Sequence, residues 1–282
     1  MNIAVASGKG GTGKTTIATN LAAAVSRTGL DVQYLDCDVE EPNGHIFLNP
    51  KIEQRDEVTV GVPEVDADKC IGCGRCAELC QYSAITCVKG NVLVFEELCH
   101  SCGGCMAVCP EEAITETQRT IGIAEFGVSN GIEFGHGKLN IGAIQTPALI
   151  KYVKQKAAAD TLTILDVPPG TSCPVIEAIR DADFVLLVTE PTPFGLNDLE
   201  LAVGMVRALK QPFAVAVNRS DIGDDGVVQY CQREGIDVLL DIPSDRRIAE
   251  AYSRGVMAID ATPEYRHKFL LLHDHISERI LV

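Results

Sequence analysis

The sequence predicts an α/β protein with a parallel sheet and a small α+β domain inserted into it. Short apolar runs alternate with helix-like stretches in the first 36 residues and again after residue 160. Strands joined by helices in this way form a parallel sheet. Between these stretches, residues from about 66 to 117 break the alternation and contain nine of the twelve cysteines. We therefore divide the chain into the first part of a main domain, an inserted domain and the second part of the main domain, at residues 1–61, 62–118 and 119–282.

The elements of the main domain follow from their apolar patterns. Residues 3–6 form an apolar run, residues 15–28 have a helical pattern that stops at Gly29, and residues 32–35 form the next buried strand. This order is a strand–helix–strand unit of a parallel sheet. After the insertion we expect strands at 162–167, 184–188, 213–217 and 238–240, and helices at 174–180, 196–209 and 227–234.

Composition and charge limit the classes of function. The absence of tryptophan and an aromatic content of 5% predict an aliphatic core, as a parallel sheet supplies. A net charge of −15 repels nucleic acid and anionic lipid, so neither nucleic acid nor a membrane is expected as a partner. The N-terminus lacks a secretory pattern and no apolar run approaches about 18 residues, which predicts a cytoplasmic protein. In that reducing compartment, twelve cysteines indicate metal or redox chemistry rather than disulfides.

A phosphate-binding loop lies between the first strand and the first helix. Gly8, Gly13, Lys14 and Thr15 have the spacing of a P-loop, in the strand–loop–helix context that this pattern requires. Glycines let successive backbone N–H groups turn towards a polyphosphate at a helix N-terminus, where the helix dipole favours negative charge. We expect Lys14 to contact the β- and γ-phosphates of ATP or ADP, and the Thr15 hydroxyl to hold Mg²⁺.

Asp166 follows the apolar run 162–165 at the carboxyl end of an expected parallel strand. Open α/β sheets bind ligands at that edge. A carboxylate there is placed to orient Mg²⁺ and its water, as a Walker B aspartate does. Together with the loop, Asp166 predicts a site for a magnesium nucleotide.

Residues 9–16, Lys-Gly-Gly-Thr-Gly-Lys-Thr-Thr, resemble the deviant Walker A motif of the MinD/ParA/Mrp family of P-loop ATPases. The mark of that motif is a second lysine early in the loop, here Lys9. Residues 36–38 resemble switch I of the family, and residues 166–170 resemble its Walker B motif and switch II.

Two later segments extend the resemblance. Asn218 and Arg219 follow a strand as the adenine-reading asparagine of the family does, although a turn-forming role is the alternative for Asn218. Residues 242–245 resemble the base-contact loop that comes next. The resemblance covers roughly residues 1–60 and 120–282 and leaves the cysteine segment as an insertion.

The resemblance implies a MinD/ParA-like P-loop NTPase of the SIMIBI class, a Mg²⁺-dependent ATPase that forms a homodimer when ATP is bound. Lys9 would reach the phosphates bound by the other protomer and, with Lys14, stabilise the transition state. Asp38 would position the attacking water, Asp36 would support the Mg²⁺ shell, and the Gly170 N–H would contact the γ-phosphate. The implied nucleotide-binding residues are Gly8, Lys9, Gly10, Gly11, Thr12, Gly13, Lys14, Thr15, Thr16, Gly170, Asn218, Arg219 and Pro243. The implied Mg²⁺ residues are Thr15, Asp36 and Asp166.

The inserted segment contains an internal repeat with an offset of 29 residues and no gap. The first copy contains Cys70, Cys73, Cys76 and Cys80, and the second contains Cys99, Cys102, Cys105 and Cys109. The spacing matches the run of bacterial ferredoxins, in which the fourth cysteine of one run ligates the other cluster. We therefore predict a ferredoxin-like domain with two [4Fe–4S] clusters. The predicted ligands are Cys70, Cys73, Cys76 and Cys109 for the first cluster, and Cys80, Cys99, Cys102 and Cys105 for the second.

Structural zinc is the alternative for these eight cysteines, but zinc sites normally use paired C-x2-C hooks around one tetrahedral ion. Gln81 stands where a proline usually follows the fourth cysteine, which alters packing or potential but removes no ligand. Cys87 and Cys231 are expected to be small buried residues. Cys37 and Cys173 lie in the expected switch segments, either as buried residues or as thiols that ligate in step with the nucleotide state.

The combination predicts an ATPase whose nucleotide-driven dimerisation is coupled to work on a partner protein. That work is either electron delivery to the partner or maturation of its iron–sulfur cluster or other metallocofactor. The expected partner is a redox protein or a protein that carries a metallocofactor. Family members with such an insertion resemble factors of anaerobic metabolism, and some relatives carry clusters. We expect switch motion at Asp38 and Gly170 to reach the insertion because it follows switch I in the chain.

Two alternatives belong to other classes. One is a positioning ATPase with redox-sensing clusters, for which residues 267–282 would form an amphipathic tail, although Asp274 and Glu278 offset its basic residues. The other is a plain ferredoxin, in which the P-loop domain has no ATPase activity and serves only as a scaffold.

Overall fold

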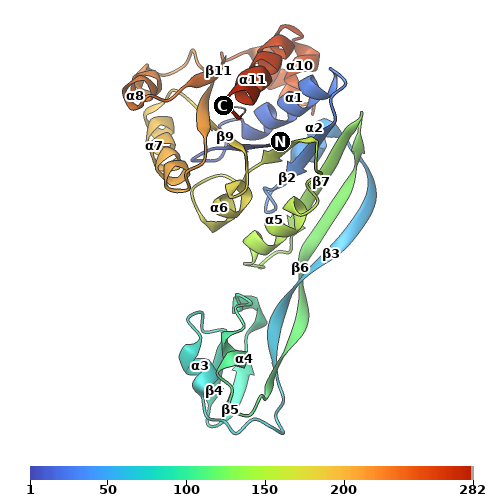
Figure 1. The fold of residues 1–282 in the computed structure, drawn as a ribbon, viewed down its shortest axis with the longest axis vertical. Coiled ribbons are helices and arrows are strands. Elements are labelled where there is room, and N and C mark those ends of the chain that lie inside the picture. The colour runs from blue at the N-terminus through green and yellow to red at the C-terminus, as the bar shows by residue number, and fades with distance from the viewer. Residues whose placement is uncertain (281–282) are drawn as a thin grey trace.

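The computed structural model describes residues 1–280, and Figure 1 shows an α/β body joined by a long two-stranded arm to a small module. The main sheet has nine strands. Seven of them run parallel to one another, in the spatial order β11 (Val238–Ile242), β10 (Phe213–Asn218), β9 (Phe184–Thr189), β1 (Asn2–Ala6), β8 (Leu162–Asp166), β2 (Val32–Asp36) and β7 (Ile132–Leu139). The predicted α/β class with a mostly parallel sheet is confirmed.

Helices cover both faces of this sheet (Figure 1). On one face, α1 (Lys14–Ser26) and α11 (Glu264–Ile280) share a core with Ile3 and Val5 of β1. On the other face, Ala4 and Ala6 join the core beneath α5 (Thr146–Lys154), α6 (Cys173–Ile179), α7 (Pro193–Ala208) and α8 (Gly226–Glu234). Strands that are buried on both faces read as continuous apolar runs, which is why the sequence located them.

Three short helices complete the body: α2 (Gly44–Leu48), α9 (Arg246–Tyr252) and α10 (Ala258–Ala261). Within residues 1–280, no helix combines the length and the apolar character that are needed to cross a membrane.

The arm consists of two long strands that the sequence analysis missed. β3 (Lys51–Val65) and β6 (Ile114–Ser129) pair antiparallel, from Lys51 opposite Val128 to Val65 opposite Ile114, and β6 continues into the main sheet beside β7. The first five residues of β3 are exposed, so this part lacks the alternation by which a half-buried strand is recognised. The division points predicted at residues 62 and 118 lie within these two strands.

The module, residues 66–113, lies at the far end of the arm (Figure 1). It contains α3 (Arg75–Leu79), a hairpin of β4 (Ile85–Val88) and β5 (Asn91–Val94), a single 3-10 turn η1 (Glu96–Leu98) and α4 (Gly104–Ala107). The sequence repeat is a structural repeat, since α3 begins after Gly74 and α4 after Gly103. Both glycines have a positive φ, 77° and 71°, which a residue without a Cβ adopts readily.

The module has two differently packed ends. Cys76, Ile85 and Ile114 form a small buried cluster of their own. Ala84 and Cys99 instead belong to the core that runs along β3 into the body. One end of the module is therefore packed against the body, and the other projects from it.

Candidate functional site

The predicted phosphate loop lies between the carboxyl end of β1 and the start of α1. Gly13 precedes the helix with a φ of 92°, and a Cβ there would lie 2.3 Å from Nδ2 of Asn218. A Cβ on Gly8 would lie 2.1 Å from the carbonyl oxygen of Asp198. The loop can follow this path only with glycine at these two positions. The buried Thr12 hydroxyl has no hydrogen-bond partner among the described residues, so a polar group is free within the loop.

Asn218, at the end of β10, holds the loop, and Arg219 follows it in the chain. The Asn218 Nδ2 donates to the Thr12 carbonyl oxygen at 2.9 Å, and the Asn218 Oδ1 accepts from the Arg219 N–H at 3.0 Å. The Arg219 guanidinium lies 2.7 Å from the Glu190 carboxylate. The Asn218 side chain therefore anchors the loop in this structure.

Asp36 is buried at the carboxyl end of β2, directly opposite Asp166 in the sheet. Its carboxylate accepts the backbone N–H groups of Asp38 at 3.1 Å, Asn43 at 3.1 Å and Gly44 at 2.9 Å. Burial raises the pKa of Asp36, and the charge of Asp166 adds to the effect. Asp36 thus fixes the loop after β2 and contributes negative charge beside Asp166.

Asp166 has one occupied and one free carboxylate oxygen. Its Oδ2 accepts from the Tyr34 hydroxyl at 2.8 Å, while its buried Oδ1 has no partner among the described residues. Burial raises the pKa of Asp166, and the Lys14 ammonium opposes that shift. A buried oxygen without a partner is costly unless a ligand satisfies it. The free Oδ1 therefore fits a cation, as Mg²⁺ binding requires.

Asp38 and Lys14 place opposite charges on the cleft beside the loop. Burial raises the pKa of Asp38 to about 6, and the nearby Lys14 charge opposes the shift. The Lys14 side chain is itself only 7% exposed. A buried lysine beside buried carboxylates is held in position for an anion that enters the cleft.

The cleft contains most of the predicted nucleotide-binding residues. Its lining includes Gly10, Gly11, Gly13, Lys14, Thr15, Thr16, Asn218, Arg219 and Pro243, together with Asp38. Gly8, Lys9, Thr12, Asp36, Asp166 and Gly170 lie outside this lining. The Gly170 N–H donates to the Ser7 carbonyl oxygen at 2.9 Å, so its implied contact with a γ-phosphate requires this bond to open.

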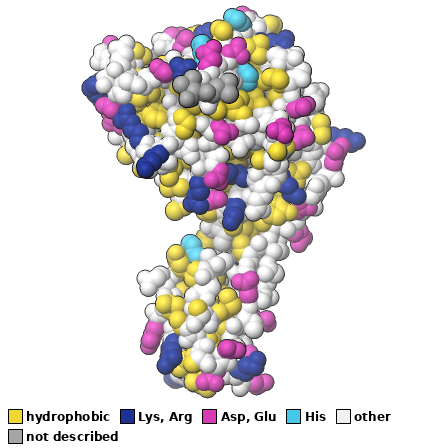
Figure 2. All heavy atoms as spheres, viewed as in Figure 1, with side chains coloured by type: hydrophobic (Ala, Val, Ile, Leu, Met, Phe, Trp, Pro, Cys, Tyr) yellow, Lys and Arg dark blue, Asp and Glu magenta, His cyan; other side chains and the backbone are white. Residues whose placement is uncertain are grey.

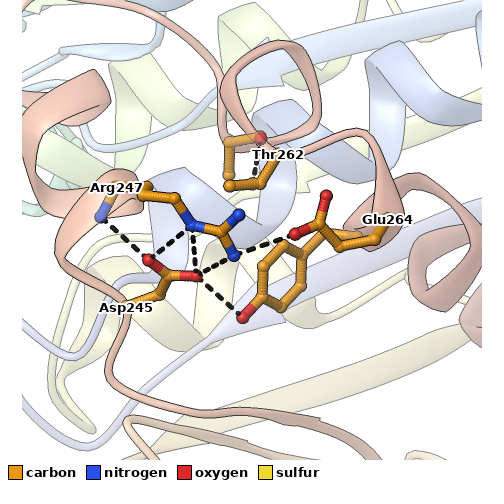
Figure 3. A network of polar contacts seen from close by, with 6 residues as sticks. Asp245, Arg247, Thr262 and Glu264 are labelled. Atoms are coloured by element: carbon orange, nitrogen blue, oxygen red, sulfur yellow. Dashed lines mark hydrogen bonds and ion pairs between the residues drawn. The ribbon is translucent and has the colours of Figure 1, made fainter.

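A polar network (Figure 3) surrounds Asp245, which lines the cleft together with Tyr265. Asp245 accepts the Arg247 N–H at 2.8 Å, and its carboxylate lies 2.7 Å from the Arg247 guanidinium. The same guanidinium lies 2.8 Å from Glu264, and the Tyr265 hydroxyl donates to Asp245 at 3.4 Å. Hydrogen bonds from Arg247 lower the pKa of Asp245 to about 2. The sequence analysis reached Asp245 but missed Arg247 and Glu264, whose pairing depends on how α9 meets α11.

The eight repeat cysteines border two hollows in the module. The distal ring, which lines the outer hollow, consists of Cys70, Cys73, Cys76 and Cys109. The proximal ring, which lines the hollow nearer the body, consists of Cys80, Cys99, Cys102 and Cys105. Each ring takes three cysteines from one copy of the repeat and one from the other, in the groupings that the spacing predicts. Within residues 1–280, no three thiol, imidazole or carboxylate side chains converge as ligands of a single metal ion.

Backbone N–H groups point at several of these sulfurs. The Ser101 N–H lies 3.4 Å from Cys99 Sγ, and the Ala113 N–H lies 3.3 Å from Cys109 Sγ. Burial opposes ionisation of Cys80, but backbone N–H groups, led by that of Tyr82, outweigh it and lower the pKa of this thiol. Thiolates that accept N–H bonds around a hollow fit an iron–sulfur cluster, whose ligands are thiolates tuned by such bonds.

The remaining cysteines have different environments. Cys37 is fully buried in the body core, and burial raises its pKa well above the ordinary value. Cys231 is also buried, and burial raises its pKa to about 11. Cys87 donates to the Gly72 carbonyl oxygen at 3.6 Å. Cys173 is exposed at the first residue of α6, so the two thiols of the expected switch segments differ in accessibility.

One contact between body and module was not predicted. The Gln145 side chain, just before α5, donates from Nε2 to the Cys99 carbonyl oxygen at 2.6 Å. Gln145 is 6% exposed, so this bond is buried. No motif marks Gln145 in the sequence, because the contact joins residues 46 positions apart.

Together, the strand–loop–helix unit and the buried aspartates at the carboxyl edge of a parallel sheet define a P-loop nucleotide-binding α/β protein. The model of the CobQ/CobB/MinD/ParA nucleotide binding domain matches residues 3–259. The chain belongs to this family.

Several relatives are similar along most of the chain. An uncharacterized protein of Methanocaldococcus jannaschii is 30% identical over 99% of this chain and 98% of its own length. An iron-sulfur cluster carrier protein of Pyrococcus horikoshii is 27% identical over 90% of this chain and 77% of its own. The cell division ATPase MinD of Pyrococcus furiosus has a TM-score of 0.58 at 21% identity and covers 98% of both chains. The MinD structure complexed with Mg-ADP from Pyrococcus horikoshii has a TM-score of 0.57 at 20% identity, over 98% of this chain and 95% of that one. These structures show the shared fold.

Proposed function

We propose that this protein binds and hydrolyses ATP, carries two [4Fe–4S] clusters, and couples nucleotide-driven dimerisation to electron delivery or to metallocofactor maturation of a partner protein. The observation that carries the proposal is the presence in one chain of a phosphate loop with buried aspartates and of two four-cysteine hollows. The name of the Pyrococcus horikoshii relative, an iron-sulfur cluster carrier protein, supports the same combination.

The residues of the cleft have distinct proposed roles in the ATPase reaction. The loop amides and Lys14 hold the phosphates, and Lys9 of each protomer reaches the phosphates in the other. Thr15 and the free Oδ1 of Asp166 hold Mg²⁺, which neutralises phosphate charge when bound. Asp38 orients the attacking water, and its pKa of about 6 leaves it mostly ionised at neutral pH. Asp36 and Gly170 position the surrounding loops.

The proposed role of the rings is to hold one cluster each. A bound cluster supplies one-electron redox chemistry. The cysteines provide the thiolates, and the N–H groups of Ser101 and Ala113 stabilise the charge on the sulfurs. Figure 2 shows hydrophobic side chains gathered on the visible face of the module, and its exposed residues include Ile71, Tyr82, Val88 and Phe95. An exposed apolar surface near the rings supports docking of a protein partner there.

The alternative of a positioning ATPase receives less support. Its tail helix would have to present an apolar face to a membrane. In α11 the apolar side chains Phe269, Leu272 and Ile276 are fully buried against the body. The last two residues of the expected tail, 281 and 282, lie outside the described residues.

The test uses protein purified without oxygen. We expect about eight iron atoms per chain, as two [4Fe–4S] clusters require. Cys73→Ala in the distal ring and Cys102→Ala in the proximal ring should each remove about half of the iron, whereas Cys173→Ala should remove none. Zinc in place of iron would contradict the cluster assignment.

The coupling is tested by ATP turnover with the iron oxidised and reduced, and by iron loss to an apo-protein acceptor with and without ATP. We expect the redox state to change turnover, or ATP to change the transfer rate. Identical rates in every condition would contradict coupling, and no turnover in the parent protein would favour an inert scaffold.

A further inference from the structure

We propose that Gln145 is a positioning residue that links the nucleotide cleft to the proximal ring through the start of α5. The inference rests on the proposed function and adds the route by which the nucleotide state reaches the cysteines. The expectation from the sequence was transmission along the chain from switch I into the insertion. The structure assigns a shorter route through side chains.

The module end of the route is a buried hydrogen bond. Gln145 donates to the Cys99 carbonyl oxygen at 2.6 Å, and its Oε1 accepts the Ile144 N–H at 3.2 Å. Both ends of the amide are therefore occupied. Cys99 is only 8% exposed and lines the proximal hollow. Because a buried amide does not leave its acceptor freely, a shift of Gln145 moves the backbone at a cysteine of this ring.

The nucleotide end of the route is the segment after β2. The Thr146 hydroxyl, next to Gln145, donates to the Glu40 carboxylate at 3.0 Å. The Val39 carbonyl oxygen accepts the Leu139 N–H at 2.8 Å. Glu40 is two residues from Asp38, which lines the cleft. The Thr146–Glu40 bond therefore passes a change in this segment, when nucleotide binds, to the start of α5, while the Val39–Leu139 bond ties the same segment to the end of β7.

The route is specific to the proximal ring. Within residues 1–280, the Gln145–Cys99 bond is the one hydrogen bond that joins the body to the module apart from those of the arm. Cys76 of the distal ring lies in the cluster with Ile85 and Ile114, and among the described residues no hydrogen bond from the body reaches a cysteine of that ring. Packed side chains and hydrogen bonds can carry energetic coupling between sites, and the one that reaches the module from Gln145 ends at Cys99 of the proximal ring.

The test measures hydrogen exchange of amides 98–105 and the EPR spectrum of the reduced protein, with and without Mg²⁺ and a non-hydrolysable ATP analogue. In the parent protein we expect the analogue to slow exchange of these amides about five-fold or more, and to alter the signal of one cluster. Exchange of amides 70–76 should not change. Gln145→Leu should abolish both responses while keeping nucleotide affinity and iron content.

Two further variants keep the test decisive. Gln155→Leu changes an exposed glutamine just after the same helix and should respond as the parent does. Thr146→Val removes the hydroxyl that contacts Glu40 without touching the ring, and should also abolish the response. If Gln145→Leu loses iron, Thr146→Val decides the question.

The inference is overturned if the response of amides 98–105 persists in Thr146→Val, or in Gln145→Leu protein that retains its iron. It is also overturned if the parent protein holds iron and binds the analogue but shows no response. A parent protein without iron, or without nucleotide affinity, would contradict the proposed function instead, and the inference would fall with it.

Discussion

In the body, the nucleotide cleft is built on a strand and a helix that are both buried. In the module, cysteine side chains line two hollows and few residues are buried. The phosphate loop lies between a strand and a helix that are both buried, and the Asn218 side chain fixes it. Residues 66–113 of the module bury only Cys76, Ala84, Ile85, Cys99 and Ala113. A segment of fewer than about 70 residues rarely buries enough apolar surface to fold alone and usually needs a metal or another cross-link. The body is therefore organised before it binds nucleotide, whereas we expect the module to depend on the clusters that its cysteines are proposed to hold.

The largest expected effect is therefore on the module when iron is removed. Chelation of iron from the anaerobic protein should abolish hydrogen-exchange protection across residues 66–113, because ligand binding supplies folding free energy there. Protection in β1, β8 and α1 should remain, and these segments serve as the internal control. Undiminished protection of the module without iron would break the comparison.

The second prediction tests the independence of the body. Leu272→Ala in α11 removes a fully buried side chain and should lower the free energy of unfolding of the body by about 2–5 kcal/mol. Leu271→Ala, at a neighbouring residue that is 41% exposed, is the matched control and should have little effect. Denaturant unfolding measures both variants. An equal loss in the two would show that α11 is not part of the core.

The third prediction separates nucleotide chemistry from iron binding. Lys14→Ala should lower ATP turnover about 10²–10³-fold, because it removes a buried positive charge aimed at the phosphates. Iron content should be unchanged, since the rings lie in the module. Lys138→Ala, at an exposed lysine of β7, is the control. Loss of iron in Lys14→Ala would show that the module depends on the nucleotide site.

The smallest expected effect concerns the hydrogen-bonded oxygen, Oδ2, of the buried Asp166. Tyr34→Phe removes the 2.8 Å hydrogen bond to Asp166 and leaves a second buried oxygen without a donor. The free energy of unfolding should fall by about 1–3 kcal/mol without nucleotide. Tyr252→Phe, whose ring is half exposed, is the control and should be neutral. If Tyr34→Phe is equally stable, the Asp166 carboxylate is satisfied in another way.

The two regions also differ in how far the sequence predicted them. The strands of the body were found because burial on both faces leaves continuous apolar runs. The P-loop was found because its backbone requires glycine at fixed positions, which leaves a recognisable spacing in the sequence. The cysteine groupings were predicted from a repeat with a constant offset of 29 residues, and the same groups line the two hollows, while cluster ligation by each group stays a prediction. The arm was missed because the start of β3 is exposed and carries no alternation. Gln145, Tyr34 and Arg247 were missed because each acts through a partner that is distant in the chain or on another element.

The sequence alone therefore determined which residue types are available: a glycine loop that accepts phosphate, aspartates at strand ends, and eight thiols at ferredoxin spacing. These follow from local geometry, which is encoded within a few consecutive residues. Only the tertiary structure decided that the thiols stand on a long arm, that one ring faces the body, and that a buried glutamine touches it. Such contacts depend on how whole elements pack. A hydrogen bond between residues 46 positions apart produces no recognisable pattern in the sequence around either residue.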